Sequence, residues 1–362
     1  MSSEPRFLLD PYGEWVTRQG IPVATGYGAH LLDIEVRPWP RLGAKGAFVH
    51  LDGRGDFIDL QLIELASGGE TAPQRHLYEC VVLVLDGHGS TEIELPSGET
   101  HAFEWGPRSL FALPLNLRYR YFNGSGAKRA RLAAITNLPF VLNAFHNEDF
   151  VFDNPYVFPE RVGEERYFRG EGTFIPVRPG RHMWETNLVP DLARFPLRGW
   201  QERGAGSNNM MFVLADGTMH AHVSEMPVGT YKKAHRHTAD FHVFALTGEG
   251  YSLYWYEGDG EFARFDWRFG SVFAPADGQF HQHFNASAEP ARYLAIAYGG
   301  LRYPFSAGKR ATYLGMDVSL KAGGRQIEYE DEDPRIRRIF EDELARRGVR
   351  SGMREGFAGT AR

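Results

Sequence analysis

Residues 229–242 read GTYKKAHRHTADFH, and the two histidines at the centre of this stretch, His235 and His237, decide how the chain is interpreted. Residues two apart on an extended strand project from the same face, so both imidazoles can point at one ion. Neutral imidazole is a ligand for zinc, iron, nickel and copper. A second pair with the same spacing, His281 and His283, follows later in the chain. The stretch therefore indicates either a metal site or a pair of exposed strand histidines.

The composition narrows the class of protein. The chain has 362 residues, enough for two domains, and 40 Lys plus Arg against 46 Asp plus Glu give a net charge of −6. No long basic run is present, so we expect no nucleic-acid partner. The one cysteine, Cys80, excludes an intrachain disulfide, and the first residues lack the pattern of a signal peptide, so we expect a cytoplasmic protein. No apolar run approaches the roughly 20 residues of a membrane helix, so no membrane partner is expected.

Short apolar runs separated by turn residues indicate an all-β protein. Aromatic residues make up 14% of the chain, which also has 41 glycines and 21 prolines, as suits strands joined by tight turns. The spacing of these runs predicts sandwiches or barrels. We expect an N-terminal arm at 1–45, a first barrel at 46–140, a linker at 141–205, a second barrel at 206–305 and a C-terminal extension at 306–362.

The two ends of the chain are expected to differ in structure. The arm shows no sustained helical periodicity and is interpreted as irregular, with a strand or two that covers an edge of the partner domain. Near the C-terminus an apolar stripe at helical spacing predicts a helix from Pro334 to Arg347, which Gly348 ends. That helix is expected to pack on a barrel or on a neighbouring subunit. Residues 351–362 are interpreted as a loose tail.

The two barrel regions repeat each other. His76 and Gly87 in the first match His237 and Gly248 in the second, with one constant offset, since 237 − 76 = 161 and 248 − 87 = 161. Such self-similarity indicates two copies of one structural unit.

The second copy resembles the two sequence boxes of the cupin superfamily, and because both copies are covered the chain resembles a bicupin. The resemblance implies two tandem barrels of the jelly-roll type, followed here by the C-terminal helix. In that family the first box supplies two histidines and a glutamate, and the second box supplies a third histidine. The residues that carry the resemblance are Gly229, His235, His237, Gly248, Gly270, Pro275, His281 and Asn285. By this match His235, His237 and His281 would bind one divalent transition metal.

The family's glutamate is missing from this sequence. Either Phe241 or His242 holds its position, and because strand residues alternate, only one of the two can face the ion. Two sites are therefore open: three histidines, or four with His242 as the fourth. Three neutral imidazoles would leave the ion its full charge and more Lewis acidity than a site with a carboxylate.

Because it lacks the glutamate, the sequence also resembles cupin dioxygenases that bind Fe(II) through three histidines. The string His-Arg-His-Thr is similar to the gentisate dioxygenase group. This resemblance implies an Fe(II) dioxygenase acting on a small oxygenated acid, aromatic or not. A second hypothesis is a non-redox isomerase, decarboxylase or lyase that uses zinc, manganese or nickel. A third is a small-molecule binding or sensor protein without catalysis. In each case we expect a small-molecule ligand and a homo-oligomer, a dimer or higher.

Several further residues near the second barrel invite an interpretation. His283 shares a face with His281 and would act in proton transfer or simply line the barrel. His220 and His222 repeat the two-residue spacing and are expected to point outward. The cations Lys232, Lys233 and Arg236 could attract a carboxylate but are interpreted as solvated charges.

The equivalent positions in the first barrel hold a weaker set of ligands. They are Gln74, His76, Cys80 and Tyr119, and one histidine with an amide, a thiol and a phenol makes a poor site for a divalent ion. We expect this barrel to be metal-free and to serve structure or dimerisation. Cys80 is interpreted as a small buried hydrophobic residue rather than a thiolate ligand.

Overall fold

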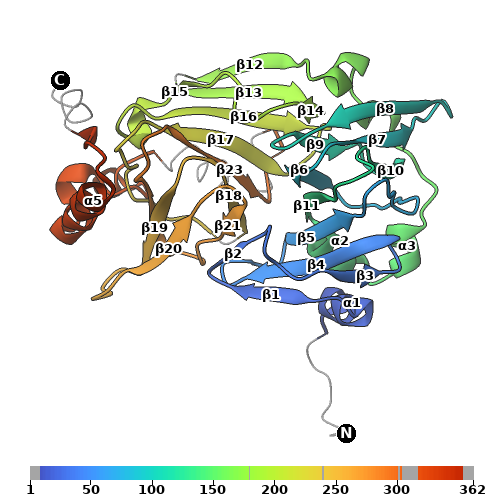
Figure 1. The fold of residues 1–362 in the computed structure, drawn as a ribbon, viewed down its shortest axis with the longest axis horizontal. Coiled ribbons are helices and arrows are strands. Elements are labelled where there is room, and N and C mark those ends of the chain that lie inside the picture. The colour runs from blue at the N-terminus through green and yellow to red at the C-terminus, as the bar shows by residue number, and fades with distance from the viewer. Residues whose placement is uncertain (1–8, 179, 239, 301, 304–316, 354–362) are drawn as a thin grey trace, which may run out of the picture.

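Two β-barrels lie side by side in a computed structural model of the chain (Figure 1), which describes residues 9–178, 180–238, 240–300, 302–303 and 317–353. Each barrel pairs a large sheet with a small three-stranded one. In the first barrel the large sheet runs β1 (Val23–Gly26), β4 (Ala44–Leu51), β5 (Asp59–Leu65), β11 (Ala130–Thr136), β6 (Cys80–Asp86), β9 (Leu110–Leu113) and β14 (Leu188–Val189), with β3 (Arg37–Trp39) beside β4. The small sheet runs β10 (Arg118–Asn123), β7 (Gly89–Glu94) and β8 (Thr100–Trp105).

The second barrel has the same plan. Its large sheet runs β12 (Thr173–Arg178), β13 (Arg181–Thr186), β16 (Asn208–Leu214), β17 (His220–Met226), β23 (Ala291–Ala297), β18 (Phe241–Thr247), β21 (Ser271–Phe273) and β2 (Gly28–His30), with β15 (Arg198–Gly199) beside β16. Its small sheet runs β20 (Ala263–Trp267), β19 (Gly250–Trp255) and β22 (Phe280–Asn285). The prediction of an all-β fold with two tandem barrels is confirmed.

The sequence repeat corresponds to equivalent strands. β18 begins 161 residues after β6, since 241 − 80 = 161, and β23 follows β11 by the same interval. The glycine that follows β6 and the glycine that follows β18 both have a positive φ, 85° at Gly87 and 70° at Gly248. A Cβ added there would lie 2.7 Å from Ala130 or 2.8 Å from Ala291, so both turns require glycine.

The two large sheets share one core. Apolar side chains of β5, β6 and β11 meet those of β16, β18 and β23 in a single buried cluster that includes Leu60, Leu83, Phe212, Phe244 and Ile296. Segments also cross between the barrels. β2 of the N-terminal arm pairs with β21, and β14 pairs with β9 of the first barrel. The arm therefore does cover an edge of the second barrel, as expected.

A helix in the N-terminal arm contradicts the expectation of irregular structure there. α1 (Pro11–Gln19) has all the local signals of a helix: Asp10 caps its first turn, Pro11 begins it and Gly20 ends it with a φ of 65°. Its apolar side chains Tyr12 and Trp15 are buried in the core of the first barrel. The helix is short and its face narrow, so no long periodic pattern marks it in the sequence.

Short helices lie between the two barrels and after the second one. Between them are α2 (Leu138–Phe145), α3 (Glu148–Phe152) and the 3₁₀ turns Pro159–Arg161 and Glu165–Arg169, and a further 3₁₀ turn between β15 and β16 is Gln201–Arg203. After the second barrel come the 3₁₀ turns Leu320–Ala322 and Tyr329–Asp331 and then α5 (Pro334–Arg347). α5 has the predicted bounds, with Gly348 as its C-cap. The sequence predicts that this helix packs on a barrel or on a neighbouring subunit. In the structure it packs on the second barrel, where Phe340 contacts Tyr231 at 4.9 Å between ring centroids.

The prediction of a loose tail at 351–362 is wrong for the first residues of that segment. Met353 is buried, and the backbone of Gly352 donates to the carbonyl of Gly229. The rest of that tail, 354–362, lies outside the described residues. Among the described residues no helix combines the length and the apolar character needed to cross a membrane.

Candidate metal centre

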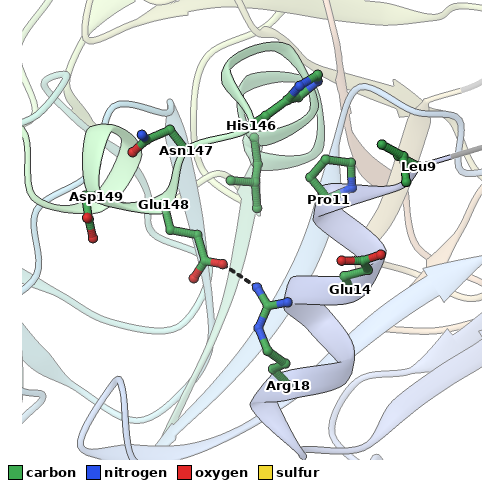
Figure 2. Close-up of a pocket in the computed structure, with 9 residues that line it drawn as sticks. Leu9, Pro11, Glu14, Arg18, His146, Asn147, Glu148 and Asp149 are labelled. Atoms are coloured by element: carbon green, nitrogen blue, oxygen red, sulfur yellow. Dashed lines mark hydrogen bonds and ion pairs between the residues drawn. The ribbon is translucent and has the colours of Figure 1, made fainter.

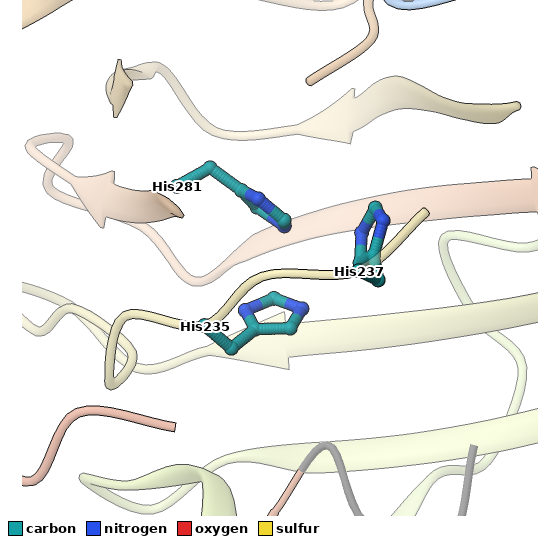
Figure 3. A group of neighbouring side chains, drawn as sticks. All are labelled: His235, His237 and His281. Carbon is teal, nitrogen blue, oxygen red and sulfur yellow. The ribbon is translucent and has the colours of Figure 1, made fainter. Parts of the chain in front are cut away.

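Three histidines from two segments meet inside the second barrel (Figure 3). His235 lies before β18 and pairs by two backbone hydrogen bonds with His281 on β22, at 3.1 and 2.9 Å. Their ring centroids are 4.2 Å apart, and that of His237 lies 4.5 Å from His281. All three side chains are buried, and one ligand nitrogen from each lies within 4.8 Å of the others. We call His235, His237 and His281 the histidine cluster.

The donor chemistry of His237 and His281 fits a divalent transition metal, and His235 would join them as a ligand once Arg203 released its Nδ1. Nδ1 of His237 lies 2.8 Å from the carbonyl of Thr238, and Nδ1 of His281 lies 3.2 Å from that of Gln279. A ring N–H that donates to a carbonyl leaves the lone pair of Nε2 for an ion. Burial lowers the pKa of His237 to about 4 and holds those of His235 and His281 well below their usual value. The rings are therefore neutral at pH 7, as metal ligation requires.

His235 differs from the other two because a buried cation contacts it. Nη2 of Arg203 donates to Nδ1 of His235 at 2.8 Å, and Nη1 donates to the carbonyl of Lys233 and the side chain of Gln326 at 3.1 and 2.8 Å. Arg203 is 2% exposed. Burial lowers its pKa, but a guanidinium stays protonated at any physiological pH. Among the described residues no carboxylate lies within ion-pair distance of Arg203, so its charge faces the cluster uncompensated.

The structure answers which residue replaces the glutamate. The ring of Phe241 lies 3.9 Å from that of His237, between centroids, so Phe241 faces the cluster. His242 points to the other side of β18, the side on which Phe244 joins the core between the barrels. Neither ring nitrogen of His242 has a hydrogen-bond partner among the described residues. The structure thus brings three of the four predicted ligands together and leaves His242 out.

The cavity at the histidine cluster is small. Its volume is about 20 Å³, room for about one water molecule. Trp200, Tyr293 and His283 complete its walls. Nε1 of Trp200 donates to Asp317 at 3.3 Å, which holds this wall in place. A substrate that fits this cavity must therefore be small.

A larger hollow lies elsewhere, on the surface of the first barrel, where α1 faces α2 and α3 (Figure 2). Its volume is about 420 Å³. Arg18 and Glu148 form an ion pair across it, and both are about half exposed. Exposed ion pairs of this kind contribute little energy and mark no chemistry.

His283 is placed by a hydrogen-bond chain. Nε1 of Trp267 donates to Oγ of Ser252 at 3.2 Å, and this oxygen lies 2.8 Å from Nδ1 of His283. In the tautomer in which Ser252 donates to Nδ1, the proton of His283 lies on Nε2. His283 lines the cavity, in agreement with either interpretation of its role.

Two expectations about polar residues near the cavity are wrong. His220 and His222 do not point outward: both are buried, their rings are joined by a hydrogen bond of 2.7 Å, and His222 lines the cavity. Strand alternation fixes only that the two share a face, and the packing of the sheets chooses which face is inside. Lys232 and Lys233 are not solvated either, with exposures of 1% and 7%.

Arg236 and Lys233 are ion-paired, whereas Lys232 is not. Arg236 is partly exposed and pairs with Glu257, close to the expected solvated state. Nζ of Lys233 lies 2.5 Å from Glu328. Arg203, Trp200 and Gln326 carry no sequence signal, because they come from segments outside the barrel repeat and reach the site only through the tertiary fold.

In the first barrel, the residues at the positions equivalent to the histidine cluster form hydrogen bonds with neighbouring groups of the same barrel. Nε2 of His76 lies 2.9 Å from the hydroxyl of Tyr119, and Nδ1 lies 2.8 Å from the carbonyl of Tyr78. The amide of Gln74 donates to three backbone carbonyls. Cys80 is buried, as expected, and burial raises the pKa of its thiol to about 12.

Comparisons with known proteins support the fold. No protein-family model and no curated protein matches the chain. The oxalate decarboxylase of Lactobacillus farciminis, in its formate complex, is similar in structure with a TM-score of 0.50 and 11% identity, over 81% of this chain and 93% of that one. Oxalate decarboxylase from Bacillus subtilis at pH 4.6 gives a TM-score of 0.48 and 13% identity, over 80% of each chain.

At these identities the likeness concerns the fold, and it gives no support to the resemblance to gentisate dioxygenases or to the choice of iron. The strand order, the 161-residue repeat and the structural likeness agree with one another. The chain has the bicupin fold, with two barrels of the cupin type in tandem.

Proposed function

We propose that the protein is a metal-dependent enzyme whose second barrel acts on a small anionic substrate without net oxidation, with decarboxylation as the favoured reaction. The observation that carries this proposal is the buried histidine cluster beside the uncompensated guanidinium of Arg203. A metal bound by His235, His237 and His281 would supply Lewis acidity, undiminished by a carboxylate ligand.

The charge of the site selects the substrate class. An ion with three neutral ligands and the buried Arg203 make the cavity strongly positive, and a low-dielectric cavity strengthens that field. A carboxylate would be attracted to it, whereas a cation would be repelled. The small volume of the cavity favours a substrate of few atoms. The named bicupin neighbour, an oxalate decarboxylase, shows that this fold can host such a reaction.

The chain's own residues supply the remaining parts of the reaction. Arg203 would hold a carboxylate by charge-assisted hydrogen bonds. When a carboxylate leaves as CO₂, the carbon left behind takes up a proton, and His283 carries one on Nε2 at the cavity wall when Ser252 donates to its Nδ1. Phe241 and Trp200 line the cavity with aromatic rings, and a lining of low polarity strengthens each of these interactions.

Metal content and oxygen dependence test this proposal together. The purified protein is analysed for metals and assayed with small carboxylic acids, with and without oxygen. We expect one divalent ion per chain and CO₂ release that persists without oxygen. Oxygen uptake coupled to turnover, with iron in the site, would favour the dioxygenase instead. Absence of bound metal under every loading condition would contradict both enzymes and leave the binding-protein hypothesis.

A matched pair of variants shows whether the histidine cluster holds the ion. His281→Ala removes a ligand of the cluster, and His242→Ala removes an equally buried histidine that lies outside it. We expect the first variant to lose the metal and the second to keep it.

A further inference from the structure

One buried amine near the cavity has no partner. Lys232 is 1% exposed, and its Nζ makes no hydrogen bond within the described part of the chain. Its backbone is fixed on both sides, because its N–H donates to the carbonyl of His283 at 3.1 Å and its carbonyl accepts from Gln282 at 2.8 Å. The direction of the side chain is therefore set by the fold.

The amine lies next to two aromatic rings that line the cavity, although Lys232 itself is not one of the lining residues. Nζ of Lys232 is 5.0 Å from the ring centroid of Tyr293 and 5.7 Å from that of Trp200, and both rings line the cavity. Aromatic faces stabilise a nitrogen cation but accept no proton from it. They form a site at which a neutral and a charged nitrogen can both exist.

The charges around Lys232 disfavour the ammonium form. Burial lowers its pKa well below the usual value, and the nearby guanidiniums of Arg203 and Arg181 lower it further. Glu225 opposes this shift, but it is paired with Arg292 at 2.7 Å. A desolvated lysine beside other cations is the usual form of an amine nucleophile.

We propose that Lys232 condenses with the carbonyl group of a small oxo acid whose carboxylate lies against Arg203. The inference rests on the proposed function in one respect, since it uses the same cavity and the same anion-holding residue. It adds the substrate class: an acid that also carries an aldehyde or ketone.

The covalent step balances without any further reactant. The lone pair of the neutral Nζ forms a bond to the carbonyl carbon, and the oxygen takes up a proton to give a carbinolamine. Loss of that hydroxyl as water leaves a C=N bond, and a proton on its nitrogen makes it an iminium. This cation can accept the electron pair released when CO₂ leaves a carbon next to the C=N group, which gives an enamine. A proton taken up by that carbon restores the C=N bond. Addition of water to the C=N bond then returns the amine and a carbonyl product.

Reductive trapping tests the proposal on the full-length protein. Glyoxylate is the probe, because it combines an aldehyde and a carboxylate in few atoms, and cyanoborohydride reduces any C=N bond to a stable amine. Peptide mass spectrometry then locates the adduct. Lys233 is the internal control, because it is adjacent in sequence but paired with Glu328. Each unit by which a pKa is lowered raises the neutral fraction of an amine about tenfold, so we expect at least about tenfold more adduct on Lys232 than on Lys233.

A second probe and two variants separate the contribution of Arg203 from that of Lys232. Acetaldehyde has the same reacting group without the carboxylate, and we expect it to label Lys232 less than glyoxylate does. Arg203→Gln should remove this difference between the probes. Lys232→Met should abolish the adduct and still fold, because an apolar chain of similar length replaces a buried amine that has no hydrogen bond among the described residues to lose. A melting temperature at or above that of the wild type checks this.

The outcomes for the two proposals are independent. Labelling of Lys232 in the His281→Ala variant, which is expected to lack metal, supports the amine even if the metal proposal fails. Bound metal without adduct on Lys232, or equal labelling of Lys232 and Lys233, overturns the amine and leaves the metal proposal standing.

Discussion

Acid should unfold this protein well above the pH at which most proteins lose stability, because its buried histidines cannot be protonated in place. Burial lowers the pKa to about 3 for His76, His220 and His242, and to about 4 for His50 and His237. In the unfolded chain each would have a pKa of about 6.5. Below that value the unfolded state binds protons that the folded state does not, so stability falls as the pH drops from about 6.5 towards 4.

The size of this effect follows from the number of such histidines. Between pH 7 and pH 5.5 each of the five lowers the free energy of unfolding by about 1.3 kcal/mol, so together they remove about 6 kcal/mol. Asp240 works in the opposite direction, because burial raises its pKa to about 6, but its contribution over this range is below about 1 kcal/mol. Domains are stable by only about 5–15 kcal/mol, so the loss is large.

Urea titrations of the metal-free protein, held with a chelator at pH 7 and pH 5.5, measure this loss through the fluorescence of its seven tryptophans. His242→Leu is the informative variant, because its imidazole has no hydrogen-bond partner among the described residues to lose. We expect the pH-dependent loss to shrink by about 1.3 kcal/mol in this variant. A free energy of unfolding that agrees within about 1 kcal/mol at the two pH values would refute the reasoning.

Three further predictions concern the site and the repeat. Phe241→Glu restores a carboxylate next to His237 and should tighten divalent-metal binding at least about tenfold by calorimetry, whereas the uncharged Phe241→Gln should not. His237→Ala should lower the metal content measured by elemental analysis to background, and retention of a full equivalent would remove His237 from the proposed ligands. Gly248→Ala should destabilise the second barrel by roughly 1–3 kcal/mol in thermal melts, because its Cβ would meet Ala291. The control Gly258→Ala has a similar backbone but open space, and an equal loss there would refute the steric explanation.

The features that the sequence predicts well are those with a local or repeated signal. The constant offset places Gly87 and Gly248 in equivalent turns, and the apolar stripe of the last helix gives the bounds that the structure shows. Spacing groups His235 with His237, but the expectation that both lie on a strand is wrong, because they lie in the segment before β18; the family resemblance adds His281. Each of these inferences uses only residues within one segment, one helix or one repeat.

The features that the sequence does not predict depend on segments far apart in the chain. Arg203 and Gln326 reach His235 from outside the repeat, and no pattern around either marks it as part of a site. The burial of His220 and Lys232 depends on which face of a strand turns inward, a choice that the packing of the two sheets makes. The helix α1 is a different case, since its capping residues were visible but its apolar face was too short to stand out.

The difference between the two barrels explains why we place the proposed chemistry in the second one. In the first barrel the hydroxyl of Tyr119 occupies Nε2 of His76, the nitrogen that an ion would need, and Trp15 of α1 adds to the apolar filling. In the second barrel the nitrogens that face one another belong to imidazoles, and the nearest aromatic ring, that of Phe241, cannot bond to them.

The first barrel contributes to the site through position rather than through ligands. The carboxylate of Asp240 accepts hydrogen bonds from the backbone N–H groups of Gly55, Phe57 and Ile58 in the first barrel. Asp240 directly precedes Phe241, so this contact fixes the start of the strand that closes one wall of the cavity. The barrel that we expect to be metal-free can therefore be required for the geometry of the other, because the two large sheets share one core and this anchor lies at its edge.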